Sequence, residues 1–135
     1  MNITSSTSRG GRALEAKVAA LAERLGLMTH KQYKVARRIW GARRHIDVVI
    51  IQTGTRKTLG VECKFQGGGG TTEEKLPSAI LDIMAWPIPG ILVFDGEGFT
   101  ENMKAYLLST GKGVALEDLE PWLRLFFGLE LIVKK

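Results

Sequence analysis

Two carboxylates and an ammonium group stand out because the residues around them favour buried β-strands. Asp47 interrupts the apolar, β-branched run HIDVVIIQ, and Glu62 and Lys64 lie in the run KTLGVECKF. A carboxylate in such surroundings loses several kcal/mol of solvation unless a partner compensates for it. Acids in a buried strand thus cost stability, and this cost indicates a function. Asp47 and Glu62, together with Lys64, are therefore the first candidates for catalytic residues.

Strand geometry is expected to bring the three groups together. Glu62 and Lys64 are two residues apart, so both side chains leave the same face of a strand. If that strand pairs with the preceding one through a turn at 53–55, Asp47 lies within reach of Glu62. Two carboxylates, with the carbonyl of Cys63 as a third oxygen, suit Mg²⁺ or Mn²⁺. Such a metal activates water for phosphodiester hydrolysis, and Lys64 is placed to hold that water and stabilise the developing charge.

Other chemistries are not indicated. The single cysteine, Cys63, and two separated histidines, His30 and His45, lack the ligand spacing of a zinc site. A lone cysteine also excludes an internal disulfide and fits a reducing cytoplasm. No apolar run approaches the ~20 residues that cross a bilayer, and the first ten residues lack the apolar segment of a secretory signal. We expect a cytoplasmic protein that does not bind membranes.

Hydrophobic spacing and turn residues predict the elements that position these groups. Residues 1–10, rich in Ser, Thr and Gly, are expected to form a mobile tail, which leaves 11–135 as a single domain. Three strands separated by short turns predict an antiparallel meander after a first helix. The glycines 67–70 precede a further helix whose start shows the capping-box spacing of Thr71 and Glu74. The predicted elements are helix 11–25, strands 32–40, 45–52 and 57–65, helix 73–86, strand 91–94, helix 100–109, edge strand 114–116 and helix 117–127.

The order α-βββ-α-β-α-β-α predicts an α/β fold, with one mixed central sheet flanked by helices. Asp47, the fourteen residues after it and then Glu62-Cys63-Lys64 resemble the motif of the PD-(D/E)XK nuclease superfamily, whose core is α-βββ-α-β. The resemblance covers roughly residues 9–122. It implies that Asp47 and Glu62 bind metal and that Lys64 assists the nucleophile. The chain departs from the motif at Ile46, where the eponymous Pro is missing.

Two further polar residues match positions that are often functional in this family. Gln66 follows Lys64 by two residues, and Glu15 stands on the first helix, where members often carry a Glu. The resemblance implies catalytic or orienting roles for both. Each also has a structural reading, because a Glu near a helix start is favoured by the helix dipole and Gln66 can hydrogen-bond the following loop.

Positive charge is concentrated in the N-terminal third of the chain. Residues 1–46 hold ten Lys and Arg against two acids, whereas residues 47–135 hold nine against twelve. This asymmetry is typical of a polyanion binder, although a solvated basic face also produces it. The residues expected to contact DNA are Arg9, Arg12, Lys34, Arg37, Arg38, Arg43, Arg44 and Lys75.

The residues and the resemblance together predict a Mg²⁺-dependent DNA endonuclease, a phosphodiesterase that acts on double-stranded or branched DNA. Within the family, a Holliday junction resolvase of DNA recombination is the leading structure-selective option, and the resemblance implies a bacterial or phage source. Such enzymes are small, basic and dimeric, so we expect a homodimer with the apolar segments 123–127 and 129–133 as its interface. Two alternatives stay open: cleavage of RNA, and a non-catalytic DNA-binding or assembly protein that kept the nuclease fold.

Overall fold

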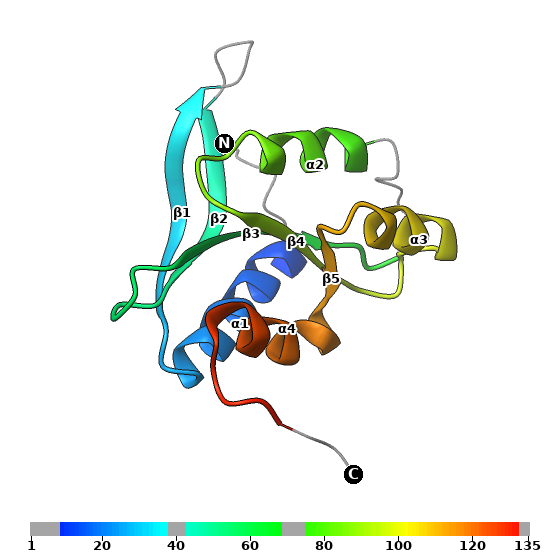
Figure 1. Cartoon of the computed structure of the whole chain (residues 1–135). Helices are drawn as coiled ribbons and strands as arrows, with labels where there is room; N and C mark the ends of the chain where they lie inside the picture. Colours follow the sequence, from blue (N-terminus) through cyan, green and yellow to red (C-terminus); the bar gives the residue numbers. More distant parts are fainter. Residues whose placement is uncertain (1–8, 38–42, 69–74, 133–135) are drawn as a thin grey trace.

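The computed structural model describes residues 9–37, 43–68 and 75–132 (Figure 1). Within them one five-stranded sheet has the strand order β1-β2-β3-β4-β5. The elements are α1 (Arg9–Arg24), β1 (Met28–Arg37), β2 (Arg43–Ile51), β3 (Thr58–Phe65), α2 (Leu76–Met84), β4 (Gly90–Asp95), α3 (Glu101–Ser109), β5 (Gly113–Ala115), a 3-10 turn (Leu116–Asp118) and α4 (Leu119–Phe127). The α/β fold with a mixed sheet flanked by helices is therefore confirmed.

The sheet combines an antiparallel half with a parallel half. β1 pairs with β2 and β2 with β3 in antiparallel register, as the predicted meander requires. β3, β4 and β5 are parallel to one another, and α2 and α3 are the crossovers between them. β3 is thus the strand at which the sheet changes direction, and it is also the strand that carries Glu62 and Lys64.

Helices cover both faces of the sheet: α1 and α4 lie on one side, and α2 and α3 on the other (Figure 1). The first core, between the sheet and α1 with α4, includes Val18, Val48, Val61 and Leu123. The second core, between the sheet and α2 with α3, includes Ile46, Leu92 and residues of both helices. Because strand side chains alternate, the core to which a strand residue belongs identifies the face from which it projects.

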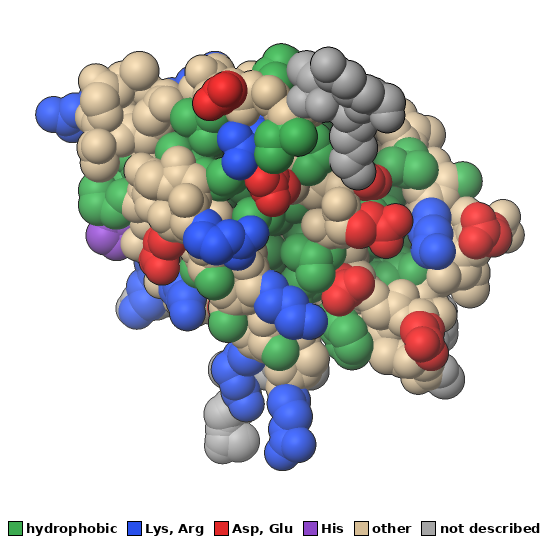
Figure 2. Space-filling model, turned by 90° about the horizontal axis from the view of Figure 1, so that it is seen from below, with side chains coloured by type: hydrophobic (Ala, Val, Ile, Leu, Met, Phe, Trp, Pro, Cys, Tyr) green, Lys and Arg blue, Asp and Glu red, His purple; other side chains and the backbone are tan. Residues whose placement is uncertain are grey.

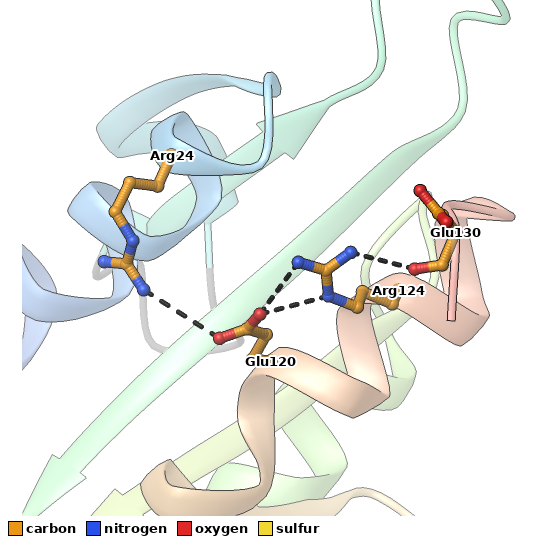
Figure 3. Close-up of polar contacts among 4 residues, drawn as sticks. All are labelled: Arg24, Glu120, Arg124 and Glu130. Atoms are coloured by element: carbon orange, nitrogen blue, oxygen red, sulfur yellow. Dashed lines mark hydrogen bonds and ion pairs between the residues drawn. The ribbon is translucent and has the colours of Figure 1, made fainter. Parts of the chain in front are cut away.

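Polar contacts of Glu120 join α4 to α1. Its Oε1 atom lies 3.9 Å from Nη2 of Arg24, and its Oε2 atom accepts hydrogen bonds from Nε and Nη2 of Arg124 at 3.0 and 2.9 Å (Figure 3). Arg124 also donates to the carbonyl of Glu130 at 2.8 Å. Ion pairs at a protein surface contribute little stability, so this network orients α4 while the apolar core holds it.

The C-terminal segment that was predicted as a dimer interface is partly used within the chain itself. Leu123 and Phe127 are buried in the core beneath α4, whereas Leu125, Leu131 and Ile132 are exposed. Phe126 and Leu129 are partly buried against the same core, and Val133 lies outside the described residues. Only the exposed residues are therefore left to contact another molecule.

Several element boundaries differ from the sequence prediction because tertiary pairing decides them. β1 begins at Met28, since Met28 to Lys31 pair with the apolar residues of β2 although they show little alternation themselves. Arg43 and Arg44 belong to β2 and not to a turn, because they pair with Arg37 and Ala36. α1 begins at Arg9, before the predicted start. The rest of the predicted tail, residues 1–8, and the predicted capping box at 71 and 74 lie outside the described residues.

The later elements are also shifted by a few residues. α2 is shorter than predicted, with Pro77 in its first turn, where a missing N–H is tolerated. β5 is shifted by one residue, to Gly113–Ala115, because its parallel pairing with β4 begins at Gly113. In the described part of the chain, no helix combines the length and apolar character that crossing a bilayer requires.

At the start of the parallel half of the sheet, the backbones of β3 and β4 pack directly against the ring of Trp86. Gly60 and Gly90 are cross-strand partners, and a Cβ atom on either would lie within 3 Å of the Trp86 ring, at 2.8 and 2.5 Å. Trp86 is buried and seals this end of the second core. Glycine is therefore required at both strand positions by the close approach of the indole.

Candidate active site

The sheet opens between β2 and β3 at Asp47. The two strands pair from Ile51↔Thr58 to Val48↔Val61, where the ladder ends. The next position on β2 is Asp47, and its Oδ2 atom accepts a hydrogen bond of 2.8 Å from the backbone N–H of Cys63. A hydrogen bond from the backbone to a side chain thus takes the place of the backbone–backbone hydrogen bonds at the point where β2 and β3 separate.

The alternation of β2 also breaks at Asp47. Ile46 belongs to the core beneath α2 and α3, whereas Val48 belongs to the core beneath α1 and α4. Residues two apart on a regular strand share a face, so the backbone rotates at the residue between them. The carboxylate of Asp47 therefore reaches across the gap to β3 and enters neither core.

Glu62 and Lys64 project from the face that α2 and α3 cover. Their neighbours Val61 and Cys63 are buried in the opposite core, which fixes the orientation by alternation. The Nζ atom of Lys64 lies 3.6 Å from Oε2 of Glu62, and both side chains are only partly exposed, at 30% and 20%. The structure thus brings the lysine and the glutamate together at the edge of the gap.

The backbone of Cys63 faces the same gap. The Gly60 N–H donates to the carbonyl of Pro89 and the Gln66 N–H to that of Asp95, so even-numbered residues of β3 turn their polar groups towards β4. Alternation turns the N–H and carbonyl of Cys63 the other way, towards Asp47. A carbonyl oxygen therefore faces the gap, as the sequence prediction of a backbone metal ligand requires.

Two residues from outside this pair of strands complete the site. Glu15, buried on α1, is joined to Asp47 by the side chain of Gln32 on β1. The Nε2 atom of Gln32 donates to Oε2 of Glu15 and to Oδ1 of Asp47, both at 3.1 Å. Gln32 was not anticipated from the sequence, because it stands in the polar stretch KQYK. Its position opposite Asp47 depends on the register of β1 with β2, which shifts between Lys34 and Ala36.

Burial raises the pKa of each acid of the site, and the charge of Asp47 raises the pKa of the other two further. Burial, followed by the charge of Asp47, raises the pKa of Glu62 to about 8, against the opposing effect of Lys64. Burial also raises the pKa of Asp47, although the Cys63 N–H and the Gln32 amide favour its charged form. The pKa of Glu15 is raised by burial and by Asp47. Carboxyls whose pKa is raised by burial and by a neighbouring acid, as those of Glu62 and Glu15 are by Asp47, are typical of functional sites.

Comparison with known proteins identifies the family. A sequence model of the PD-(D/E)XK nuclease superfamily domain matches residues 6–120. The chain belongs to the PD-(D/E)XK nuclease superfamily. A crystal structure of a protein of unknown function, AF1548, has the same fold, with a TM-score of 0.54 and 22% identity over 90% of this chain and 71% of that one. None of the curated proteins is significantly similar to the chain.

Membership of the PD-(D/E)XK superfamily confirms the resemblance drawn from Asp47 and Glu62-Cys63-Lys64, and it indicates a hydrolytic nuclease. The missing Pro at Ile46 does not prevent the match. Ile46 instead fills the core beneath α2, where it is almost completely buried. The residue before the aspartate thus has a packing role in this chain.

The donor set of this PD-(D/E)XK site fits a hard divalent cation. Within the described residues, no three His, Cys, Asp or Glu side chains converge as a complete ligand set. The oxygens at the gap are those of Asp47 and Glu62, with the Cys63 carbonyl turned towards them. The charge of Asp47 raises the pKa of the partly buried Glu62, so negative charge accumulates between the two carboxylates, and oxygen ligands with this excess of charge suit Mg²⁺ or Mn²⁺.

Gln66 is held by the loop after β4. Its side chain is buried, and its carbonyl accepts a hydrogen bond from the Gly98 N–H at 2.7 Å. A Cβ atom on Gly96 would lie 2.2 Å from the Gln66 carbonyl oxygen, so the loop backbone packs directly on this residue. These backbone contacts explain a structural function for Gln66, and its catalytic function stays a prediction.

The basic residues predicted to bind DNA lie on several elements. Arg9, Arg12, Lys34 and Lys75 are exposed on α1, on β1 and immediately before α2. The backbones of Arg37, Arg43 and Arg44 lie at the end of the β1–β2 hairpin beyond Asp47, and Arg38 lies outside the described residues. Figure 2 shows Lys and Arg gathered towards one side of the face seen from below and most Asp and Glu towards the other. Charge is therefore polarised over this face, as polyanion binding favours.

Proposed function

We propose that this protein is a metal-dependent DNA endonuclease that hydrolyses phosphodiester bonds. One observation carries the proposal: the sheet opens at Asp47 so that Asp47, Glu62 and Lys64 meet at one gap. A fold that needed only stability would not place two repelling carboxylates at this opening. Superfamily membership supports the same conclusion.

Each residue has a distinct part in the proposed reaction. Asp47 and Glu62 hold a Mg²⁺ ion, with the carbonyl of Cys63 as a further oxygen ligand. When bound, this ion supplies a water of lowered pKa and neutralises charge on the phosphate. The ammonium of Lys64, beside Glu62, holds the attacking water or hydroxide by hydrogen bonding and stabilises the charge that develops on the phosphoryl oxygens.

The proposed substrate is DNA, double-stranded or branched. The basic residues of α1 and β1 supply the phosphate contacts, which position a nucleic acid without reading its sequence. Because such contacts do not read sequence, we favour a structure-selective enzyme such as a Holliday junction resolvase. A homodimer would present two sites to two strands, as such a reaction requires.

A cleavage panel tests the proposal. Purified protein is incubated with Mg²⁺ or Mn²⁺ and plasmid, linear duplex, single-stranded, flap, four-way-junction and RNA substrates. We expect cleavage of at least one DNA, loss of at least ~100-fold in rate for Lys64→Ala, and binding of that DNA within about threefold of the wild type, because Lys64 is one of many cationic contacts. Lys57→Ala is the matched control, since Lys57 precedes the start of β3, at the end of the strand far from the gap.

The outcomes separate the alternatives. If the wild type binds DNA but cuts no substrate with either metal, the protein is a non-catalytic binder and the proposal is wrong. If only RNA is cut, the proposed phosphodiester hydrolysis is supported, but the assignment of DNA as the substrate is wrong. If Lys57→Ala reduces cleavage as much as Lys64→Ala does, the assignment of Lys64 to the reaction fails.

A further inference from the structure

Gln32 joins the two carboxylates that come from different layers of the molecule. A single atom, Nε2, donates to Oε2 of Glu15 on α1 and to Oδ1 of Asp47 on β2, both at 3.1 Å. In the described structure this amide is the hydrogen-bonding group that links the helix carboxylate to the sheet carboxylate. Asp47 is thereby held at both oxygens, by Gln32 at one and by the Cys63 N–H at the other.

Gln32 makes these two hydrogen bonds from a strained backbone conformation. Gln32 has a φ of 54°, a left-handed conformation that a Gln rarely adopts inside a strand. The register of β1 with β2 runs through Lys31↔Val48 and Tyr33↔Ile46, so Gln32 stands opposite Asp47, where no regular pair forms. Strained backbone of this kind persists where the surrounding structure over-determines it, and it is concentrated at functional sites.

We propose that Gln32 is a positioning residue of the active site, which sets the place of Glu15 relative to Asp47 and orients Asp47 for the metal. This inference rests on the proposed function, because the arrangement that it fixes is that of the metal site. Hydrogen bonds to ligating carboxylates typically change metal affinity or activity by 10–100-fold when they are removed. Gln32 therefore supports the ligand geometry while it contacts neither substrate nor metal itself.

The variant Gln32→Gly removes the amide and accepts the positive φ without strain. Its matched control is Arg56→Gly, because Arg56 is the other described non-glycine residue with a positive φ, at 67°, and it lies in the distant turn between β2 and β3. We expect Gln32→Gly to weaken Mn²⁺ binding about 10–100-fold in calorimetric titration without DNA. Arg56→Gly should keep an affinity within about twofold of the wild type, since it changes no group at the site.

A second measurement needs no metal. In a double-mutant cycle with EDTA present, the urea midpoints of wild type, Gln32→Gly, Glu15→Ala and the double variant are compared. We expect non-additive shifts, because either single change already breaks the Gln32–Glu15 hydrogen bond. Glu23→Ala is the control partner; Glu23 lies on α1 but bonds Thr29, so its shift should add to that of Gln32→Gly.

The two measurements keep the inference and the proposed function apart. Additive shifts for Gln32 and Glu15 overturn the inference whether or not the protein binds metal. In a wild type that binds Mn²⁺, an unchanged or tighter affinity of Gln32→Gly also overturns it. If the wild type neither binds Mn²⁺ nor cuts DNA, the proposed function fails, while the metal-free cycle still decides whether Gln32 positions Glu15.

Discussion

The carboxylate of Asp47 accepts a hydrogen bond of 2.8 Å from the backbone N–H of Cys63, across the gap at which β2 and β3 separate. This contact gives Asp47 two functions that substitutions can separate. As an acceptor it completes the sheet, and as an anion it contributes to the charge of the site. The neighbouring acids respond to the second function, since the charge of Asp47 raises the pKa of both Glu62 and Glu15.

Asp47→Asn and Asp47→Ala should therefore differ in stability although both lose cleavage. Asn keeps an oxygen for the Cys63 N–H and removes the charge that repels Glu62, whereas Ala leaves that N–H without its acceptor. We expect Asp47→Ala to be less stable than Asp47→Asn by about 1–3 kcal/mol, in urea unfolding at pH 8 with EDTA. Equal stability of the two variants would show that the hydrogen bond to Cys63 contributes nothing measurable.

The raised pKa of Glu62 predicts how the stability of the metal-free protein depends on pH. The folded protein binds the Glu62 proton more tightly than the unfolded chain, with a folded pKa of about 8 against an ordinary value of 4.5. The resulting contribution is fully present below about pH 4.5 and is lost as the pH rises towards 8. Unfolding free energies of wild type and Glu62→Gln, measured with EDTA from pH 5 to pH 9, should show a steeper decline for the wild type. Parallel curves would mean that the Glu62 carboxyl ionises normally.

The sequence predicted the element order and the grouping of Asp47, Glu62 and Lys64 because both depend on local signals. Asp47 in an apolar run, and Glu62 and Lys64 two residues apart, are visible without any coordinates. The opening of the sheet is not visible, since it arises from the rotation of β2 between Ile46 and Val48, which pack in opposite cores. Gln32 was missed for the same reason: its φ and its register are set by tertiary pairing, and Gln carries no sequence signal for a left-handed backbone.

The contact of Trp86 with β3 and β4 predicts a strict requirement for glycine at the start of the parallel half. In Gly60→Ala and Gly90→Ala the new methyl would meet the indole at 2.8 and 2.5 Å, so the ring or the strands must shift. We expect each variant to lose about 1–3 kcal/mol of stability through overpacking. Gly54→Ala is the control, because a Cβ atom there meets nothing within 4 Å. Chemical denaturation monitored by tryptophan fluorescence measures all three, and a Gly60→Ala protein as stable as Gly54→Ala would contradict the packing argument.

The position of the basic residues predicts which charges govern DNA affinity. Lys34 is exposed on β1, the strand that carries Gln32 beside the site, whereas Lys57 lies near the other end of β3, with its Nζ atom 4.5 Å from the centre of the Phe126 ring. If phosphates approach the gap along β1, Lys34→Ala should lower the slope of log affinity against log salt by about 1, as the loss of one phosphate contact does. Lys57→Ala removes the same charge and should leave the slope unchanged. Fluorescence anisotropy with a labelled duplex from 50 to 200 mM salt, a range over which such contacts dominate, gives both slopes. A slope that falls equally in both variants would mean that DNA affinity depends on the net charge of the protein and not on phosphate contacts along β1.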